Sequence, residues 1–186
     1  GFTTAWLPFF LSFSQNPSAG HEQLRRAMTY YFIGFGSLTL LFFAWARPVV
    51  GLLAASAFEH AHVVVGYCAA AYFLVGVFSV LLPPLYYARQ VWAVTVIQGI
   101  GVILAILLQF VLIARFGILG AAIGLTSGFL ILCLLLAGWL WVFRERYFPI
   151  RYDWPRVLGF GCVLVLGAAV SLPTGPTSPL VAVGWS

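Results

Sequence analysis

The segment QFVLIARFGILGAAIGLTSG, residues 109–128, determines the topology of the chain. An apolar run ends at Ile113, a single charge follows at Arg115, and Phe116-Gly117 precedes a second apolar run. This pattern predicts a membrane helix that leaves the bilayer, a very short hairpin, and a second helix that re-enters it. Three glycines with GxxxGxxxG spacing open the second helix and predict close helix packing there: Gly120, Gly124 and Gly128.

The composition of the whole chain excludes an ordinary soluble domain. Of its 186 residues, 63% are hydrophobic and 7% are charged, and the mean hydropathy is +1.06. A soluble domain carries about 25% charged residues, so lipid is the solvent that suits this chain. The sequence starts and stops inside apolar runs. We therefore expect residues 1–186 to form one transmembrane domain that is a fragment of a longer protein.

Outside the hairpin, further apolar runs predict an all-α, polytopic membrane helix bundle. We expect about five complete transmembrane helices, with partial helices at both ends. Prolines interrupt the pattern at Pro8, Arg47-Pro48 and Pro83-Pro84. Residues 14–28 form a predicted polar loop, with a short interfacial helix after Ser18 as an alternative. The expected complete spans are residues 29–46, 63–85, 91–114, 118–143 and 157–172.

The basic residues divide unequally between the two predicted faces of the membrane. All nine are Arg, and alternation of the loops places seven on one face and two, Arg47 and Arg115, on the other. Cytoplasmic loops are rich in basic residues, so the first face is predicted to be cytoplasmic. Since the arginines lie in loops between apolar runs, we expect no nucleic-acid partner. The seven are Arg25, Arg26, Arg89, Arg144, Arg146, Arg151 and Arg156.

Polar side chains inside the predicted spans are the candidate substrate pathway. Gln98 and Gln109 are separated by three helical turns plus about 20°, and Thr95 lies about 60° from their line. These side chains either form a polar stripe toward a water-filled cavity or bond to an adjacent helix. Arg47 and Arg115 either snorkel to the interface or meet an anionic group, such as a lipid-linked diphosphate, at the outer mouth.

The sequence contains no recognisable catalytic or metal-binding arrangement. None of its four acidic residues lies mid-membrane, and its three histidines do not pair with Cys or Ser as a nucleophile and base. Its three cysteines lie inside apolar runs without metal-ligand spacing. We therefore predict a protein that is not an enzyme and has no cofactor, metal or catalytic residue. Glu59, His60 and His62 form either a solvated loop or a proton-linked site.

In their order and spacing, these features resemble the C-terminal half of bacterial polysaccharide flippases. These flippases are the polysaccharide transporter branch of the multidrug/oligosaccharidyl-lipid/polysaccharide exporter superfamily. An aromatic-x-x-Ala feature matches Phe58 to Ala61, and a proline before a basic loop matches Pro8 and Arg25-Arg26. The family has an Asn where this chain has Gln109, followed by an fG-x-x-GAA-x-a turn. The matching residues are Gln109, Leu112, Ile113, Phe116, Gly117, Gly120, Ala121, Ala122 and Ile123.

The resemblance covers roughly residues 1–156 and implies most of the second helix bundle of an exporter. It implies that undecaprenyl-diphosphate-linked oligosaccharide moves from the inner to the outer leaflet of the bacterial inner membrane by alternating access. The implied process is O-antigen, lipopolysaccharide or exopolysaccharide biosynthesis. The implied partners are the lipid bilayer, the lipid-linked oligosaccharide, the N-terminal half of the same chain and a glycan polymerase.

Three alternatives remain open. One is a drug or metabolite exporter of the same superfamily, which the absence of Asp and Glu from the predicted spans disfavours for organic cations. Another is a membrane-embedded glycan polymerase or ligase, which would need a large outer loop that is missing from these residues. The last is a non-catalytic membrane scaffold.

Overall fold

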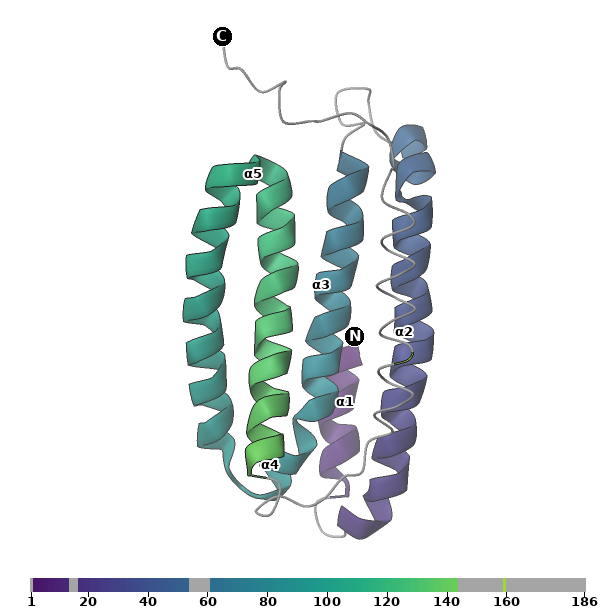
Figure 1. The fold of residues 1–186 in the computed structure, drawn as a ribbon. Coiled ribbons are helices and arrows are strands. Elements are labelled where there is room, and N and C mark those ends of the chain that lie inside the picture. Colours follow the sequence, from purple (N-terminus) through teal and green to yellow (C-terminus); the bar gives the residue numbers. More distant parts are fainter. Residues whose placement is uncertain (1, 14–16, 54–60, 144–158, 160–186) are drawn as a thin grey trace.

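The computed structural model describes residues 2–13, 17–53, 61–143 and 159. All regular structure in these ranges is α-helical, and the long helices lie side by side as a bundle (Figure 1). Three helical stretches are long and apolar enough to cross a membrane: Glu22–Ala46, Val64–Tyr87 and Val91–Val142. The elements in chain order are α1 (Phe2–Leu11), α2 (Pro17–Leu53), α3 (Ala61–Leu81), α4 (Pro83–Tyr87) and α5 (Val91–Val142).

The longest element, α5, is a hairpin. As a straight rod its 52 residues would extend about 78 Å, more than twice the ~30 Å hydrocarbon core of a bilayer. Gly117 interrupts it with φ 56° and ψ −130°, a conformation that a residue with a β-carbon adopts only under strain. The chain reverses there, so residues 91–116 (the first limb) and 118–142 (the second limb) lie antiparallel (Figure 1). The predicted turn at Phe116-Gly117 is confirmed.

The centre of the bundle is α3, which packs against both α2 and α5. It is apolar around its whole circumference, which is typical of a helix enclosed by other elements. Its backbone carbonyls accept hydrogen bonds from both neighbours. The Tyr31 hydroxyl of α2 donates to the Phe73 carbonyl at 2.9 Å, and the Thr126 hydroxyl of the second limb donates to the Tyr67 carbonyl at 2.9 Å.

The main hydrophobic core lies at the end of the bundle where α1 and α4 meet the long helices. Phe10 and Leu85 are almost completely buried there. The Trp6 indole donates to the Ser79 carbonyl at 2.9 Å, and the Tyr87 hydroxyl donates to the Phe10 carbonyl at 2.6 Å. These bonds attach the short α1 to α3 and α4. The hairpin tip lies at the opposite end of the bundle (Figure 1).

Helices continue through regions where the sequence predicts an interruption. For residues 14–28 the sequence predicts a loop, with a short interfacial helix after Ser18 as the alternative, and the structure is closer to the helical alternative. The helix is the start of the long α2, which begins at Pro17, because proline suits the first position of a helix and Glu22 forms ion pairs with the arginines that follow it. The predicted interruption at Arg47-Pro48 is wrong, because Pro48 lies inside α2, which continues to Leu53. Pro8 lies inside α1. Prolines are tolerated in membrane helices where local adjustments and neighbouring groups satisfy the freed carbonyl.

Other predicted boundaries agree with the structure. The prediction that Pro83-Pro84 kink or end a span is confirmed, because α3 ends at Leu81 and the prolines begin the short α4. The first four expected spans correspond to α2, α3 and the two limbs of α5. The fifth, residues 157–172, lies outside the described residues apart from Gly159, so the predicted count of five is not confirmed.

Candidate functional site

Glycines bring the two limbs of α5 into close contact. A methyl group on Gly120 would collide with the backbone carbonyl of Leu112. A methyl group on Gly128 would lie 2.9 Å from the Ala105 methyl group. Both contacts join residues at nearly equal separations from Gly117, so the limbs pair in a single antiparallel register. Only a residue without a side chain permits such an approach of two helix backbones.

Gln109 is the polar side chain that lies between the limbs. Its Nε2 atom donates to the Ala121 carbonyl at 3.4 Å, and a methyl group on Gly124 would lie 3.1 Å from its Oε1 atom. A separation of 3.4 Å is long for a hydrogen bond, so this contact holds the amide weakly. The half-buried amide lines an otherwise apolar groove of about 300 Å³, whose walls include Phe110 and Phe129.

The other two polar residues of the predicted pathway lie away from this groove. Gln98 and Thr95 are exposed on the first limb, and neither lines the groove. The buried face at this level is formed by Ile97 and Gly101, which lie about 100° and 60° to one side of Gln98 around the helix. Because the line of contact drifts around the limb, residues on one helical face meet different surroundings. Of Thr95, Gln98 and Gln109, only Gln109 therefore contacts the second limb.

The two arginines predicted at the outer mouth lie toward the hairpin end of the bundle. Arg115 is exposed, two residues before the bend at Gly117. Arg47 lies near the end of α2, which Figure 1 places at the same end as the bend. Its side chain is outside the described part of the structure. Glu59 and His60 also lie outside the described residues, as does the side chain of His62.

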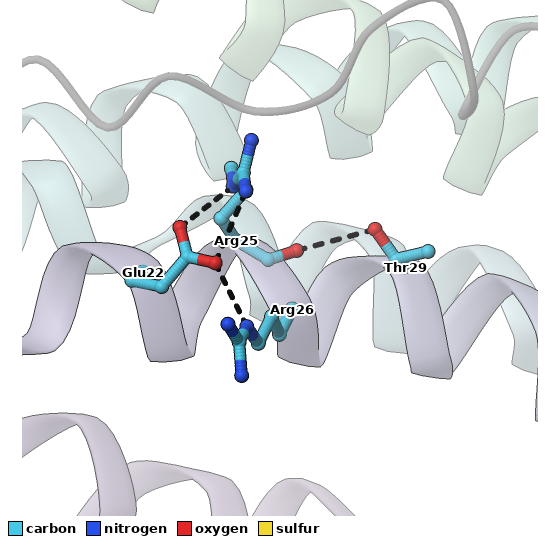
Figure 2. A network of polar contacts seen from close by, with 4 residues as sticks. All are labelled: Glu22, Arg25, Arg26 and Thr29. Atoms are coloured by element: carbon cyan, nitrogen blue, oxygen red, sulfur yellow. Dashed lines mark hydrogen bonds and ion pairs between the residues drawn. The ribbon is translucent and has the colours of Figure 1, made fainter.

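An ion-pair network occupies the opposite end of the bundle, in the first turns of α2 (Figure 2). Glu22 accepts from Arg25 through both carboxylate oxygens, each at 3.0 Å, and from Arg26 Nε at 2.8 Å. The Thr29 hydroxyl donates to the Arg25 carbonyl at 3.3 Å. Arg89 is exposed in the turn after α4, at the same end of the bundle. This is the face that the sequence assigns to the cytoplasm.

Sequence reasoning did not identify the partners in the contacts that join α3 to its neighbours. Besides the Tyr31 and Thr126 bonds, the Cys133 thiol of the second limb donates to the Leu74 carbonyl at 3.3 Å. A hydroxyl in an apolar run is a signal for such a bond, but the accepting carbonyl belongs to a distant part of the chain. In the described part of the chain, no group of three or more His, Cys, Asp or Glu residues is placed to hold a metal ion.

Comparisons with known proteins leave the function to be argued from the residues of the chain. No protein-family model, no curated protein and no solved structure matches it. Three features of the described structure bear on function: the groove at Gln109, the charges at the two ends and the way in which the helices are joined.

Proposed function

We propose that this chain is the second helix bundle of a flippase in the bacterial inner membrane. It moves undecaprenyl-diphosphate-linked oligosaccharide from the inner to the outer leaflet by alternating access, for cell-surface polysaccharide biosynthesis. The observation that carries the proposal is the groove between the limbs of α5, in which apolar walls surround the Gln109 amide. A polar side chain at membrane depth is a functional-site candidate. A lipid-linked oligosaccharide offers both an apolar chain and hydrogen-bonding groups to such a groove.

The charges of the described residues favour an anionic cargo. Neither α3 nor α5 contains Asp or Glu, and the one charged residue in α5 is Arg115. A guanidinium group binds phosphate oxygens through paired hydrogen bonds. Arg115 at the hairpin tip is therefore a suitable contact for the diphosphate as it reaches the outer face. A bundle that exports organic cations would need a carboxylate in place of this arginine.

The contact between the limbs favours a change between two arrangements. Glycine contacts join the limbs without interlocking side chains, so few side chains would have to repack if one limb shifted against the other. Between the described limbs, the polar contact is the long bond from Gln109 to Ala121. A small displacement of the first limb would break that bond and expose the amide to a substrate. Rocking of helices around a central site is the general basis of alternating access.

Variants of Arg115, Arg47 and Gln109 test the proposed function in the native host. We expect Arg115→Ala and Gln109→Leu to lower surface polysaccharide, measured by gel electrophoresis of extracted glycan, while immunoblots of membrane fractions show normal insertion. Arg115→Lys keeps the positive charge and should retain more polysaccharide than Arg115→Ala. Unchanged polysaccharide in the inserted Arg115→Ala, Arg47→Ala and Gln109→Leu variants would contradict the proposal.

A further inference from the structure

Among the described non-glycine residues, Arg89 alone has a positive φ, of 55°. It follows α4 in a turn closed by two backbone hydrogen bonds, from Arg89 N to the Tyr86 carbonyl and from Gln90 N to the Leu85 carbonyl, both at 3.0 Å. This pair of bonds defines the Schellman motif, in which glycine is the usual residue at the left-handed position. An arginine at that position destabilises the turn relative to glycine, because its β-carbon crowds the backbone.

Within the described part of the structure, no contact of the Arg89 side chain offsets the destabilisation of the turn. The side chain is exposed, and no ion pair or hydrogen bond of its guanidinium group is seen among the described residues. Backbone strain that packing does not require points to a role for the side chain outside the folded chain.

Arg89 lies at the same end of the bundle as the network of Glu22, Arg25 and Arg26. Arg25 holds the Glu22 carboxylate through two hydrogen bonds. Arg26 reaches the same carboxylate through Nε, and the outer part of its guanidinium group extends away from the helix in Figure 2. Its side chain is 65% exposed. Among the described residues at this end, one carboxylate therefore faces three guanidinium groups, and Arg26 and Arg89 contribute an excess of positive charge.

We propose that Arg26 and Arg89 form a binding surface for the phosphate headgroups of anionic lipids in the cytoplasmic leaflet. The bundle end meets the headgroup region, where guanidinium groups pair with phosphate oxygens and a negative surface attracts basic side chains. The half-buried Tyr86 beside this turn has the amphipathic character of side chains at the membrane interface. The surface does not depend on the transported substrate and exists whether or not the bundle is a flippase.

Native mass spectrometry of the full chain tests the proposal. The protein is extracted from vesicles containing equal amounts of phosphatidylglycerol and phosphatidylcholine, and the ratio of the two lipids retained is measured. We expect Arg89→Gly and Arg26→Gln each to lower the phosphatidylglycerol preference by about fivefold, the usual contribution of one basic residue near an anionic surface. Arg89→Lys should keep the preference. Thr29→Val removes a hydroxyl from the network at the same end without changing its charge, so it is the matched control and should also keep the preference.

Thermal unfolding of the same variants separates lipid binding from folding. We expect Arg89→Gly to unfold in neutral detergent at the same or a higher temperature than the parent, because glycine relieves the backbone strain. An unchanged lipid ratio in the Arg26→Gln/Arg89→Gly double variant would overturn the proposal. A lower unfolding temperature for Arg89→Gly would overturn it too, because Arg89 would then support the fold. Surface polysaccharide is not a readout here, so failure of the proposed transport leaves this result unaffected.

Discussion

On one side, the second limb of α5 meets α3 through side chains that donate hydrogen bonds to backbone carbonyls. Thr126 donates to the Tyr67 carbonyl at 2.9 Å, and Cys133 donates to the Leu74 carbonyl at 3.3 Å. On its other side, the same limb meets the first limb through glycines, and the Gln109 amide makes a long contact there. The second limb is thus held to α3 by hydrogen bonds (the interface held by directed bonds) and to the first limb by close packing of the backbones (the interface held by shape).

The difference shows two ways to join helices in a membrane, where burial of apolar surface adds little to the stability of helix association. Lipid tails are as apolar as the side chains, so packing and hydrogen bonds must hold the helices together. An interface held by shape is sensitive to a single added methyl group, because the backbones lie in contact. An interface held by directed bonds is sensitive to the loss of a hydroxyl. Substitutions that add or remove one group therefore distinguish the two interfaces.

The largest expected effect is that of Gly120→Ala in the interface held by shape. The added methyl group would meet the backbone carbonyl of Leu112, which cannot turn aside as a side chain can. We expect overpacking to lower the free energy of unfolding by about 1–3 kcal/mol, measured by circular dichroism during titration with a denaturing detergent.

Gly99→Ala is the matched control for this substitution. Gly99 lies in the first limb of α5, and nothing lies within 4 Å of the position of an added methyl group. Alanine there should leave stability unchanged or raise it by up to about 1 kcal/mol, because it favours helix more than glycine does. Equal losses in Gly99→Ala and Gly120→Ala would show that the glycine contacts do not hold the limbs.

Gly117→Ala is expected to act through backbone conformation, since nothing lies within 4 Å of an added methyl group there either. The positive φ of 56° should make this variant about 1–2 kcal/mol less stable in the same titration. Gly138→Ala is its control, because Gly138 has equally open surroundings and no positive φ. If Gly117→Ala and Gly138→Ala both unfold at the same detergent concentration as the parent, the positive φ at Gly117 does not require glycine.

The smallest expected effect is that of Thr126→Val in the interface held by directed bonds. Loss of the bond to the Tyr67 carbonyl should lower the free energy of unfolding by about 0.6 kcal/mol, the average for such bonds between membrane helices. The Thr126 hydroxyl also lies 3.1 Å from the Ala122 carbonyl of its own helix. Ser127→Ala is therefore the control, because it removes only a bond of that local kind, from the Ser127 hydroxyl to the Ile123 carbonyl at 2.7 Å. If Ser127→Ala lowers the free energy of unfolding as much as Thr126→Val does, the bond to α3 contributes no more than a bond within one helix.

The features predictable from sequence are those that depend on neighbouring residues. The reversal at Phe116-Gly117 follows from a charge and a glycine between two apolar runs, and the end of α3 follows from Pro83-Pro84. The start of α2 was not predictable from polarity alone. Its first turns are polar, yet Glu22 pairs with the arginines three and four residues further on and helps to keep them helical.

The candidate site was less predictable because it depends on how the limbs wind around each other. Helical angles place Gln98 and Gln109 on one face, but the line of contact drifts, so that Gln109 meets the second limb and Gln98 is exposed. The carbonyl partner of Thr126 lies 59 residues away in the chain, and no local pattern specifies it. The roles of Arg47 and Arg115 in transport stay predictions.

The central claim is that residues 91–142 cross the membrane twice and reverse at Gly117. Labelling of single cysteines with a membrane-impermeant maleimide tests it most directly. The background carries Cys68→Ala, Cys133→Ala and Cys162→Ala, and cysteine is then introduced singly at Gln90, Ile118 or Phe143. Ile118, beside the bend, is 79% exposed. We predict that the cysteine at position 118 reacts from one side of the membrane and those at positions 90 and 143 from the other. Reaction of all three from the same side, or of those at 90 and 143 from opposite sides, would contradict the hairpin.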